Sequence, residues 1–233
     1  MKTKRTHQYY LLLSALSLIV LVVIIWFFPM DYPSSFYDKL VTGVAFCGSC
    51  LLGVSLTVRP NWMRQYISRS SPLPQRNITR NHPEITFRGH HPICTPFRSH
   101  VISIRGNIRC AGCLGLALGA GASLVLFVVY LFVSPLSFLV SHVMFLTGVC
   151  LIPLSLAATK NTARHSMIRV ILNFVLIVGF LFITLSILEI TARPSFAMLA
   201  VLFSWLWIAL RKELSLWNHH TICQSCSRTC KMY

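Results

Sequence analysis

Long apolar runs alternate with short polar segments along the chain. Six runs are apolar and almost free of charges, and they cover residues 10–28, 40–58, 111–133, 136–158, 170–190 and 194–210. Each is close to the about 20 residues that an α-helix needs to cross a bilayer. Inside lipid the backbone must satisfy its own hydrogen bonds, so such runs form helices. The pattern therefore predicts an all-α integral membrane protein with about six transmembrane helices.

The composition agrees with this fold class. Hydrophobic residues make up 55% of the 233 residues, charged residues only 11%, and the mean hydropathy is +0.67. The connections 29–39, 134–135 and 191–193 are short, so we expect the helices to pair as antiparallel hairpins. The first run follows a basic tail but ends without a small-residue cleavage site, so we expect a retained anchor rather than a signal peptide.

The basic residues are distributed unevenly between the two predicted sides of the membrane. The formal net charge is +16, and with the N-terminus inside, 19 of the 21 basic residues fall on the cytoplasmic side. Only Lys39 and Arg193 fall on the other side. The positive-inside rule explains this bias without a nucleic-acid partner. We therefore predict a multi-pass protein of the cell membrane with both termini in the cytoplasm, whose basic face also suits anionic lipids.

The polar segments complete the predicted organisation. Residues 59–86 are rich in Pro, Ser, Asn and Arg, which is typical of a linker. The chain then divides into two N-terminal transmembrane helices (1–58), a basic cytoplasmic linker (59–86), a Cys/His-rich cytoplasmic motif (87–113), a four-helix transmembrane region (111–210) and a Cys/His-rich cytoplasmic tail (211–233).

A short β-hairpin is expected within the Cys/His-rich motif. Residues 101–104 read VISI and favour a strand, Gly106 and Asn107 supply a turn, and Ile108 leads into Cys110. The hairpin would lead directly into a Cys-Ala-Gly-Cys knuckle, in which Gly112 is expected to relieve strain in the turn. Beyond it, Gly115 and Gly119 stand four residues apart, as do Ala117 and Gly121, and this spacing favours close helix packing.

Two similar motifs on the predicted cytoplasmic side suggest a metal site. HHPIC ends at Cys94 and HHTIC ends at Cys223, and each is followed by two further cysteines. Cytoplasmic thiols normally stay reduced, so metal ligation is favoured over structural disulfides. A set of four ligands that mixes cysteine sulfur and histidine nitrogen suits the tetrahedral coordination of zinc. The candidate ligands are His91, Cys94, Cys110, Cys113, His220, Cys223, Cys226 and Cys230.

The grouping of these ligands is open. Two separate sites would explain the repeated His-His-x-x-Cys, with His91 and Cys94 in one site and His220 and Cys223 in the other. A single all-thiolate site would instead join Cys110, Cys113, Cys223 and Cys226, and would tie the third span to the sixth. An iron–sulfur cluster is the alternative to zinc, although the histidines count against it.

The same cysteines also allow thiol or electron-transfer chemistry. A reactive thiolate needs nearby positive charge, and Arg105 and Arg109 lie beside Cys110 in the sequence. Cys47 and Cys50 form another Cys-x-x-Cys within the second span, where packing is the favoured interpretation.

The stretch CAGCLGLALGA, with Cys94, Arg98 and Ser99 before it, resembles the signature of a family of small prokaryotic membrane proteins known as domain of unknown function 2085. In that family an early cysteine and an Arg-Ser step precede C-x-x-C-x-G-x-x-x-G at the start of a helix. Cys110 and Cys113 match this pattern in register. The family has no assigned activity, so the resemblance implies a multi-pass fold and no function.

The sequence therefore favours a metal-stapled membrane protein with a structural or partner-binding role in a membrane assembly. The alternative is a redox protein that uses the same thiols. Coupled transport has the least support, because the predicted spans hold little polar chemistry beyond His142 and Asn173. Glu189 and Arg193 are expected to form an interfacial ion pair. Motifs for hydrolysis or phosphoryl transfer are absent from the sequence, which leaves open whether the protein is an enzyme.

Overall fold

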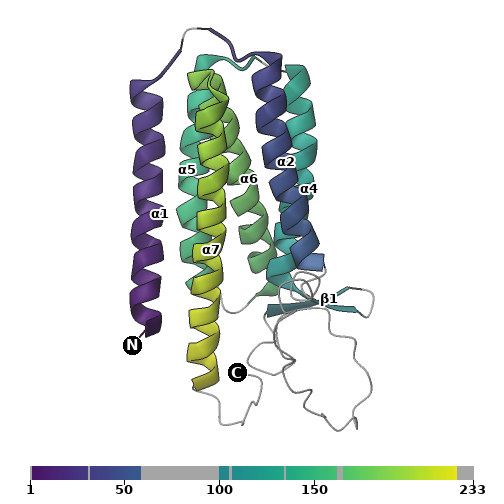
Figure 1. Cartoon of the computed structure of the whole chain (residues 1–233). Helices are drawn as coiled ribbons and strands as arrows, with labels where there is room; N and C mark the ends of the chain where they lie inside the picture. Colours follow the sequence, from purple (N-terminus) through teal and green to yellow (C-terminus); the bar gives the residue numbers. More distant parts are fainter. Residues whose placement is uncertain are drawn as a thin grey trace, which may run out of the picture.

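A computed structural model of the chain describes residues 2–30, 32–58, 100–104, 107–133, 135–161 and 165–224. Within these residues, six helices are long and apolar enough to cross a membrane (Figure 1). This confirms the prediction of an all-α, multi-pass membrane protein. The elements are α1 (Lys2–Phe27), α2 (Phe36–Val58), β1 (Val101–Ile104), β2 (Asn107–Cys110), α4 (Ala111–Val133), α5 (Phe138–Asn161), α6 (Ser166–Thr191) and α7 (Pro194–Gln224).

Several helices extend beyond the apolar runs that predict them. Helix α4 coincides with its run, whereas α2 and α6 each begin four residues earlier than theirs and α7 continues to Gln224. Consequently Lys39, Arg169 and Arg211, which the sequence analysis assigned to connections or to the tail, lie within helices. The physical reason is that Lys and Arg favour helix, so a charge ends an apolar run without ending the helix that contains it.

The helices alternate in direction, so the structure has two distinct ends. We call the end with the β-hairpin the hairpin end; the starts of α1, α4 and α6 and the last residues of α2, α5 and α7 also lie there (Figure 1). The connections from α1 to α2, α4 to α5 and α6 to α7 lie at the other end, which we call the opposite end (Figure 1).

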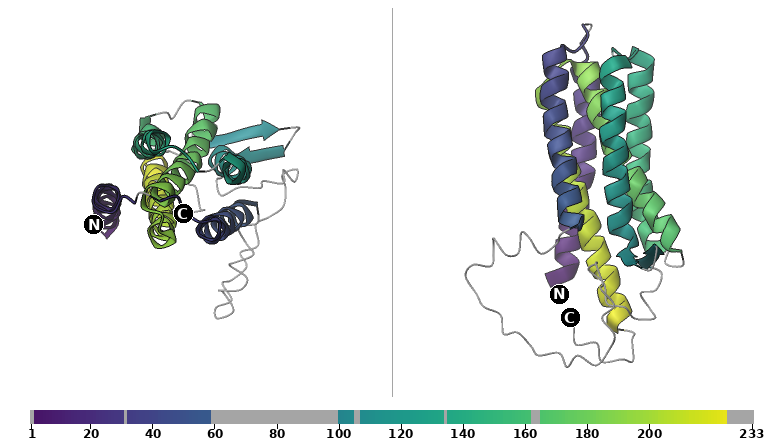
Figure 2. Two further views of the ribbon diagram at one scale, coloured as in Figure 1. Left: turned by 90° about the horizontal axis from the view of Figure 1, so that it is seen from above. Right: turned by 90° about the vertical axis from the view of Figure 1, so that its right-hand side faces the viewer.

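Helix α6 occupies the centre of the bundle (Figure 2). It packs most extensively against α5 and α4, and it also contacts α7, α1 and α2. In its most apolar window 72% of the residues are buried, whereas no other span exceeds 33%. The outer helices instead expose large apolar side chains such as Trp26 and Phe132. Helix α6 is therefore the interior helix of the bundle.

Small residues bring α4 and α6 together, as the sequence predicts. A Cβ atom added to Gly119 would lie 2.8 Å from the carbonyl oxygen of Phe174 on α6, and one added to Gly115 would also meet α6 backbone. Gly121, which we also expected to pack closely, has nothing within 4 Å of such an atom, so the prediction is wrong at that position. Gly115 and Gly119 therefore allow backbone contact between the two helices.

The cysteines of α2 also pack in the interior. Cys50 belongs to the buried apolar core, and Cys47 is half-buried and packs against it. This confirms the packing interpretation of that Cys-x-x-Cys pair.

The two strands form an antiparallel hairpin in which Val101 pairs with Cys110 and Ile104 with Asn107. Cys110 is thus the last residue of β2 and directly precedes α4. His100, immediately before β1, is buried. The hairpin therefore fixes the position of Cys110 against the first turn of α4.

Candidate functional site at the hairpin end

Cys110 and Cys113 form the centre of a polar cluster at the hairpin end. Cys110 is buried at the end of β2, and Cys113 is half-buried in the first turn of α4. Their thiol groups are close enough to interact with each other, and neither is in a disulfide. The two-residue spacing at a helix start therefore directs both sulfurs to one place, as the Cys-x-x-Cys pattern predicts.

Two arginines from other helices lie beside these thiols. The charge of Arg211 on α7 interacts with both sulfur groups, and that of Arg169 on α6 interacts with Cys110. Asn173 connects the two: its side-chain oxygen accepts a hydrogen bond from Nε of Arg211, and its Nδ2 donates to the carbonyl oxygen of Arg169 at 2.5 Å. The cluster therefore joins α4, α6 and α7.

Arg169 is buried without a full set of hydrogen-bond partners. Its residue is only 9% exposed, and Nε and Nη2 are buried with no acceptor. Within the described part of the chain, neither Arg169 nor Arg211 has a carboxylate partner. An uncompensated buried cation is costly, so this end of the bundle favours negative charge.

Gly112 gives Arg211 room to enter the cluster. A Cβ atom added to Gly112 would lie 2.7 Å from Nη2 of Arg211, 3.6 Å from Nδ2 of Asn173 and 3.8 Å from Sγ of Cys110. Gly112 lies in the regular first turn of α4. Its role in the structure is therefore close approach of a guanidinium, rather than the relief of turn strain that we expected from the sequence.

The structure brings together two of the eight predicted metal ligands. Cys110 and Cys113 are in contact, while His220 and Cys223 fall in the last turns of α7, where their side chains lie outside the description. His91, Cys94, Cys226 and Cys230 also lie outside the described residues. Among the residues that are described, no three His, Cys, Asp or Glu side chains gather as a metal site. Zinc binding, and its grouping into one or two sites, stays a prediction.

The arginines that the sequence analysis placed near Cys110 are not those in the cluster. Arg109 is exposed on β2, and Arg105 lies outside the described residues. Arg169 and Arg211 were missed because each was assigned to a polar segment outside the bilayer. One sequence signal was available, since Arg169 and Asn173 stand four residues apart and therefore share a helix face.

A second polar cluster lies at the opposite end. Nζ of Lys39 is 3.5 Å from Oε1 of Glu189, and both side chains are buried. The same oxygen accepts hydrogen bonds from the hydroxyl of Tyr130 and, at 3.1 Å, from Oγ of Ser34. Glu189 thus pairs with Lys39 on α2, whereas we expected Arg193; the guanidinium of Arg193 lies over the ring of Phe196 instead.

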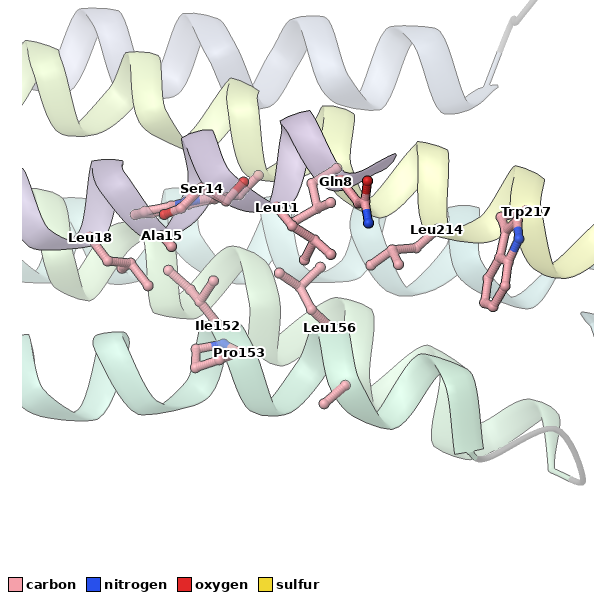
Figure 3. A pocket seen from close by; sticks show the side chains of 13 residues that line it. Gln8, Leu11, Ser14, Ala15, Leu18, Ile152, Pro153, Leu156, Leu214 and Trp217 are labelled. Atoms are coloured by element: carbon pink, nitrogen blue, oxygen red, sulfur yellow. The ribbon is translucent and has the colours of Figure 1, made fainter. Parts of the chain in front are cut away.

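An apolar pocket of about 690 Å³ lies between α1, α5 and α7 (Figure 3). Leu11, Ser14 and Leu18 line it from α1, and Ile152 and Leu156 line it from α5. The buried hydroxyl of Ser14 has no hydrogen-bond partner. Gln8 is a further polar residue of the walls, which are otherwise mostly apolar, so the pocket suits an acyl chain of the surrounding bilayer and lacks the convergent polar groups of a catalytic site.

The helices contain more charge than the sequence analysis assigned to the spans. Lys39, Arg169 and Arg211 lie within membrane-length helices, in addition to Asn173 and Glu189 of the predicted spans. Ionisable groups at such positions mark functional sites in membrane proteins. Comparisons with protein-family models, with curated proteins and with solved structures found no match to this chain, so the resemblance to the domain of unknown function 2085 family stays a prediction.

Proposed function

We propose that the chain is a multi-pass protein of the cell membrane in which Cys110 and Cys113 are two ligands of a structural zinc site on the cytoplasmic side. The observation that carries the proposal is the contact of two thiols, neither in a disulfide, beside two arginines that have no carboxylate partner in the described structure. Zinc takes cysteine as thiolate, and adjacent guanidinium groups stabilise the excess negative charge of a thiolate-rich site.

The remaining ligands come from segments next to this cluster in the chain. In the two-site arrangement, His91 and Cys94 complete the site of Cys110 and Cys113, while the tail forms its own site. In the pooled arrangement, Cys223 and Cys226 complete it, which suits the end of α7 at the hairpin end (Figure 1). Either arrangement fixes the hairpin end and leaves a basic face for membrane-protein partners or anionic lipids.

Metal analysis of the purified full-length protein tests the proposal. We expect one or two equivalents of zinc, and Cys113→Ser should lower both the zinc content and the melting temperature, because metal binding contributes directly to folding. Cys150→Ser is the matched control, since Cys150 is an exposed thiol on α5. Less than about half an equivalent of zinc in the wild type would contradict the proposal, because a structural site is nearly full.

The stoichiometry distinguishes the two arrangements. With two sites, Cys223→Ser should reduce the zinc content from two equivalents to one and leave the site of Cys113 filled. With a pooled site, either Cys223→Ser or Cys113→Ser should abolish binding of a single equivalent. In the double variant Cys113→Ser with Cys223→Ser, the losses of zinc add if each cysteine belongs to its own site. If the site is pooled, the second substitution causes no further loss of zinc.

A dithiol function is the second candidate, because Cys110 and Cys113 need no further ligand for it. In this reaction the two thiols reduce a disulfide of a partner protein: one S–S bond forms between Cys110 and Cys113, the partner's S–S bond breaks, and both protons pass to the partner's sulfurs. Incubation of metal-free protein with glutathione disulfide, followed by alkylation and mass spectrometry, tests it. Absence of a Cys110–Cys113 disulfide after equilibration would exclude this function.

A further inference from the structure

Arg169 is the least compensated polar side chain in the described structure. Its residue is 9% exposed, and Nε and Nη2 are both buried with no acceptor. In arginine, the Nη1 amino group lies on the side of Cδ, so Nε–H and the Nη2 amino group form the opposite edge of the guanidinium. The two unpaired atoms thus make up one fork, the geometry that binds two oxygens of the same anion.

The surroundings of this fork are positive. The charges of Arg169 and Arg211 are close enough to repel each other, and neither has a carboxylate partner in the described residues. Arg169 also lies near Cys110, which directly precedes α4, so the start of that helix is adjacent. The first N–H groups of a helix have no partner within it, and its dipole favours an anion at this end.

We propose that Arg169, Arg211 and the first turn of α4 bind a phosphate group. A tetrahedral oxyanion offers one pair of oxygens to the fork of Arg169 and others to Arg211 and to backbone N–H groups. Gly112 lets Arg211 approach the start of α4, since a Cβ atom there would lie 2.7 Å from Nη2 of Arg211. The phosphate comes either from free phosphate or from a lipid headgroup, because the site lies at the end of membrane-length helices.

This site is separate from the proposed zinc ligands, although the two are neighbours. A zinc-bound thiolate keeps part of its negative charge, but it does not offer a pair of oxygens to the fork of Arg169, whose Nε and Nη2 atoms have no acceptor. Phosphate is held by the arginines, whereas zinc is ligated by the cysteines. The two proposals are therefore tested with different ligands.

Equilibrium dialysis of the full-length protein in a maltoside detergent, with radiolabelled inorganic phosphate as the probe, tests the site. Dihexanoyl phosphatidylglycerol serves as the lipid probe in a parallel titration. We expect one of the two to bind saturably at one equivalent, and Arg169→Gln to weaken it about tenfold or more, because hydrogen bonds to a charged group are lost. Lys212→Gln is the matched control, since Lys212 is an exposed cation next to Arg211.

Saturable phosphate binding identifies free phosphate as the source, and binding of the lipid probe alone identifies a headgroup. Arg169→Lys keeps the charge but removes the fork, and it should also weaken binding about tenfold, which decides the matter if the glutamine variant does not fold. Failure of both probes to bind would overturn the proposal, as would equal effects of Arg169→Gln and Lys212→Gln. Zinc content is measured on the wild type in the same preparation, so failure of the zinc proposal is detected independently of phosphate binding.

Discussion

Glu189 is the acceptor that compensates a buried lysine at the opposite end. Its Oε1 atom receives Lys39, Tyr130 and Ser34, so one carboxylate satisfies groups from α2, from α4 and from the connection before α2. Both charged side chains of the Lys39–Glu189 pair are buried. Removal of one partner from such a pair costs far more than removal of both, because the remaining charge stays buried without compensation.

We therefore expect Glu189→Ala to lower the free energy of unfolding by about 3–5 kcal/mol, because it breaks a buried ion pair and removes the acceptor of Tyr130 and Ser34. The double variant Lys39→Met with Glu189→Leu should recover most of this loss. Unfolding of the purified protein in mixed detergent micelles, followed by tryptophan fluorescence, measures both. Equal losses in the single and double variants would show that the pair itself is unimportant.

At the scale of single residues, the sequence predicted chemistry only where partners are close along the chain. Cys110 and Cys113 are three positions apart, so their contact follows from local geometry. Arg211 reaches them from about a hundred residues further along the chain, through the packing of α7 against α6. No local sequence pattern predicts that approach. Gly112 permits it, but from the sequence alone Gly112 is interpreted as an ordinary turn residue.

At the scale of helices, the contact between α4 and α6 depends on absent side chains. A Cβ atom at Gly119 would lie 2.8 Å from a carbonyl oxygen and 3.0 Å from Cα of Phe174, both of them backbone atoms that cannot rotate away. Between helices in lipid, where the hydrophobic effect is weak, close backbone packing is the main source of attraction. Small residues at this contact are therefore required.

Gly119→Leu should separate α4 from α6 and lower the free energy of unfolding by about 1–3 kcal/mol or more, the usual cost of overpacking. Gly121→Leu is the control, because Gly121 lies on the same helix with open space around it. The thermal melting temperature of both variants in one detergent provides the comparison. Equal melting temperatures would contradict the assigned role of Gly119.

The helices themselves were predictable, but their ends and their arrangement were not. Helix α4 ends where its apolar run ends, whereas α6 starts at Ser166 and carries Arg169 inside its first turns. The central position of α6 was also hidden, because its run is no longer or more distinctive in composition than the others. In lipid both exposed and buried faces are apolar, so hydropathy does not distinguish a central helix from an outer one.

At the scale of the whole molecule, α4 and α6 are connected at three levels. Glu189 and Tyr130 link them at the opposite end, Gly119 brings their backbones together, and at the hairpin end Arg169 and Asn173 on α6 lie beside the cysteines of α4. Helix α7 joins this pair through Arg211. Polar contacts therefore connect the helices at both ends of an otherwise apolar bundle, and the thiols and arginines lie together at the hairpin end.

The proposals require this end to face the cytoplasm, which thiol labelling in intact cells tests. The wild type should not react with a membrane-impermeant maleimide, because its cysteines are predicted to lie inside the cell or within the bilayer. Arg193→Cys should react from outside, since Arg193 is exposed at the opposite end. Ser103→Cys, exposed on β1 at the hairpin end, should react above the wild-type level only after permeabilisation. The reverse pattern would place the cysteines in an oxidising environment, where disulfides replace zinc ligation and both proposed functions of Cys110 and Cys113 fail.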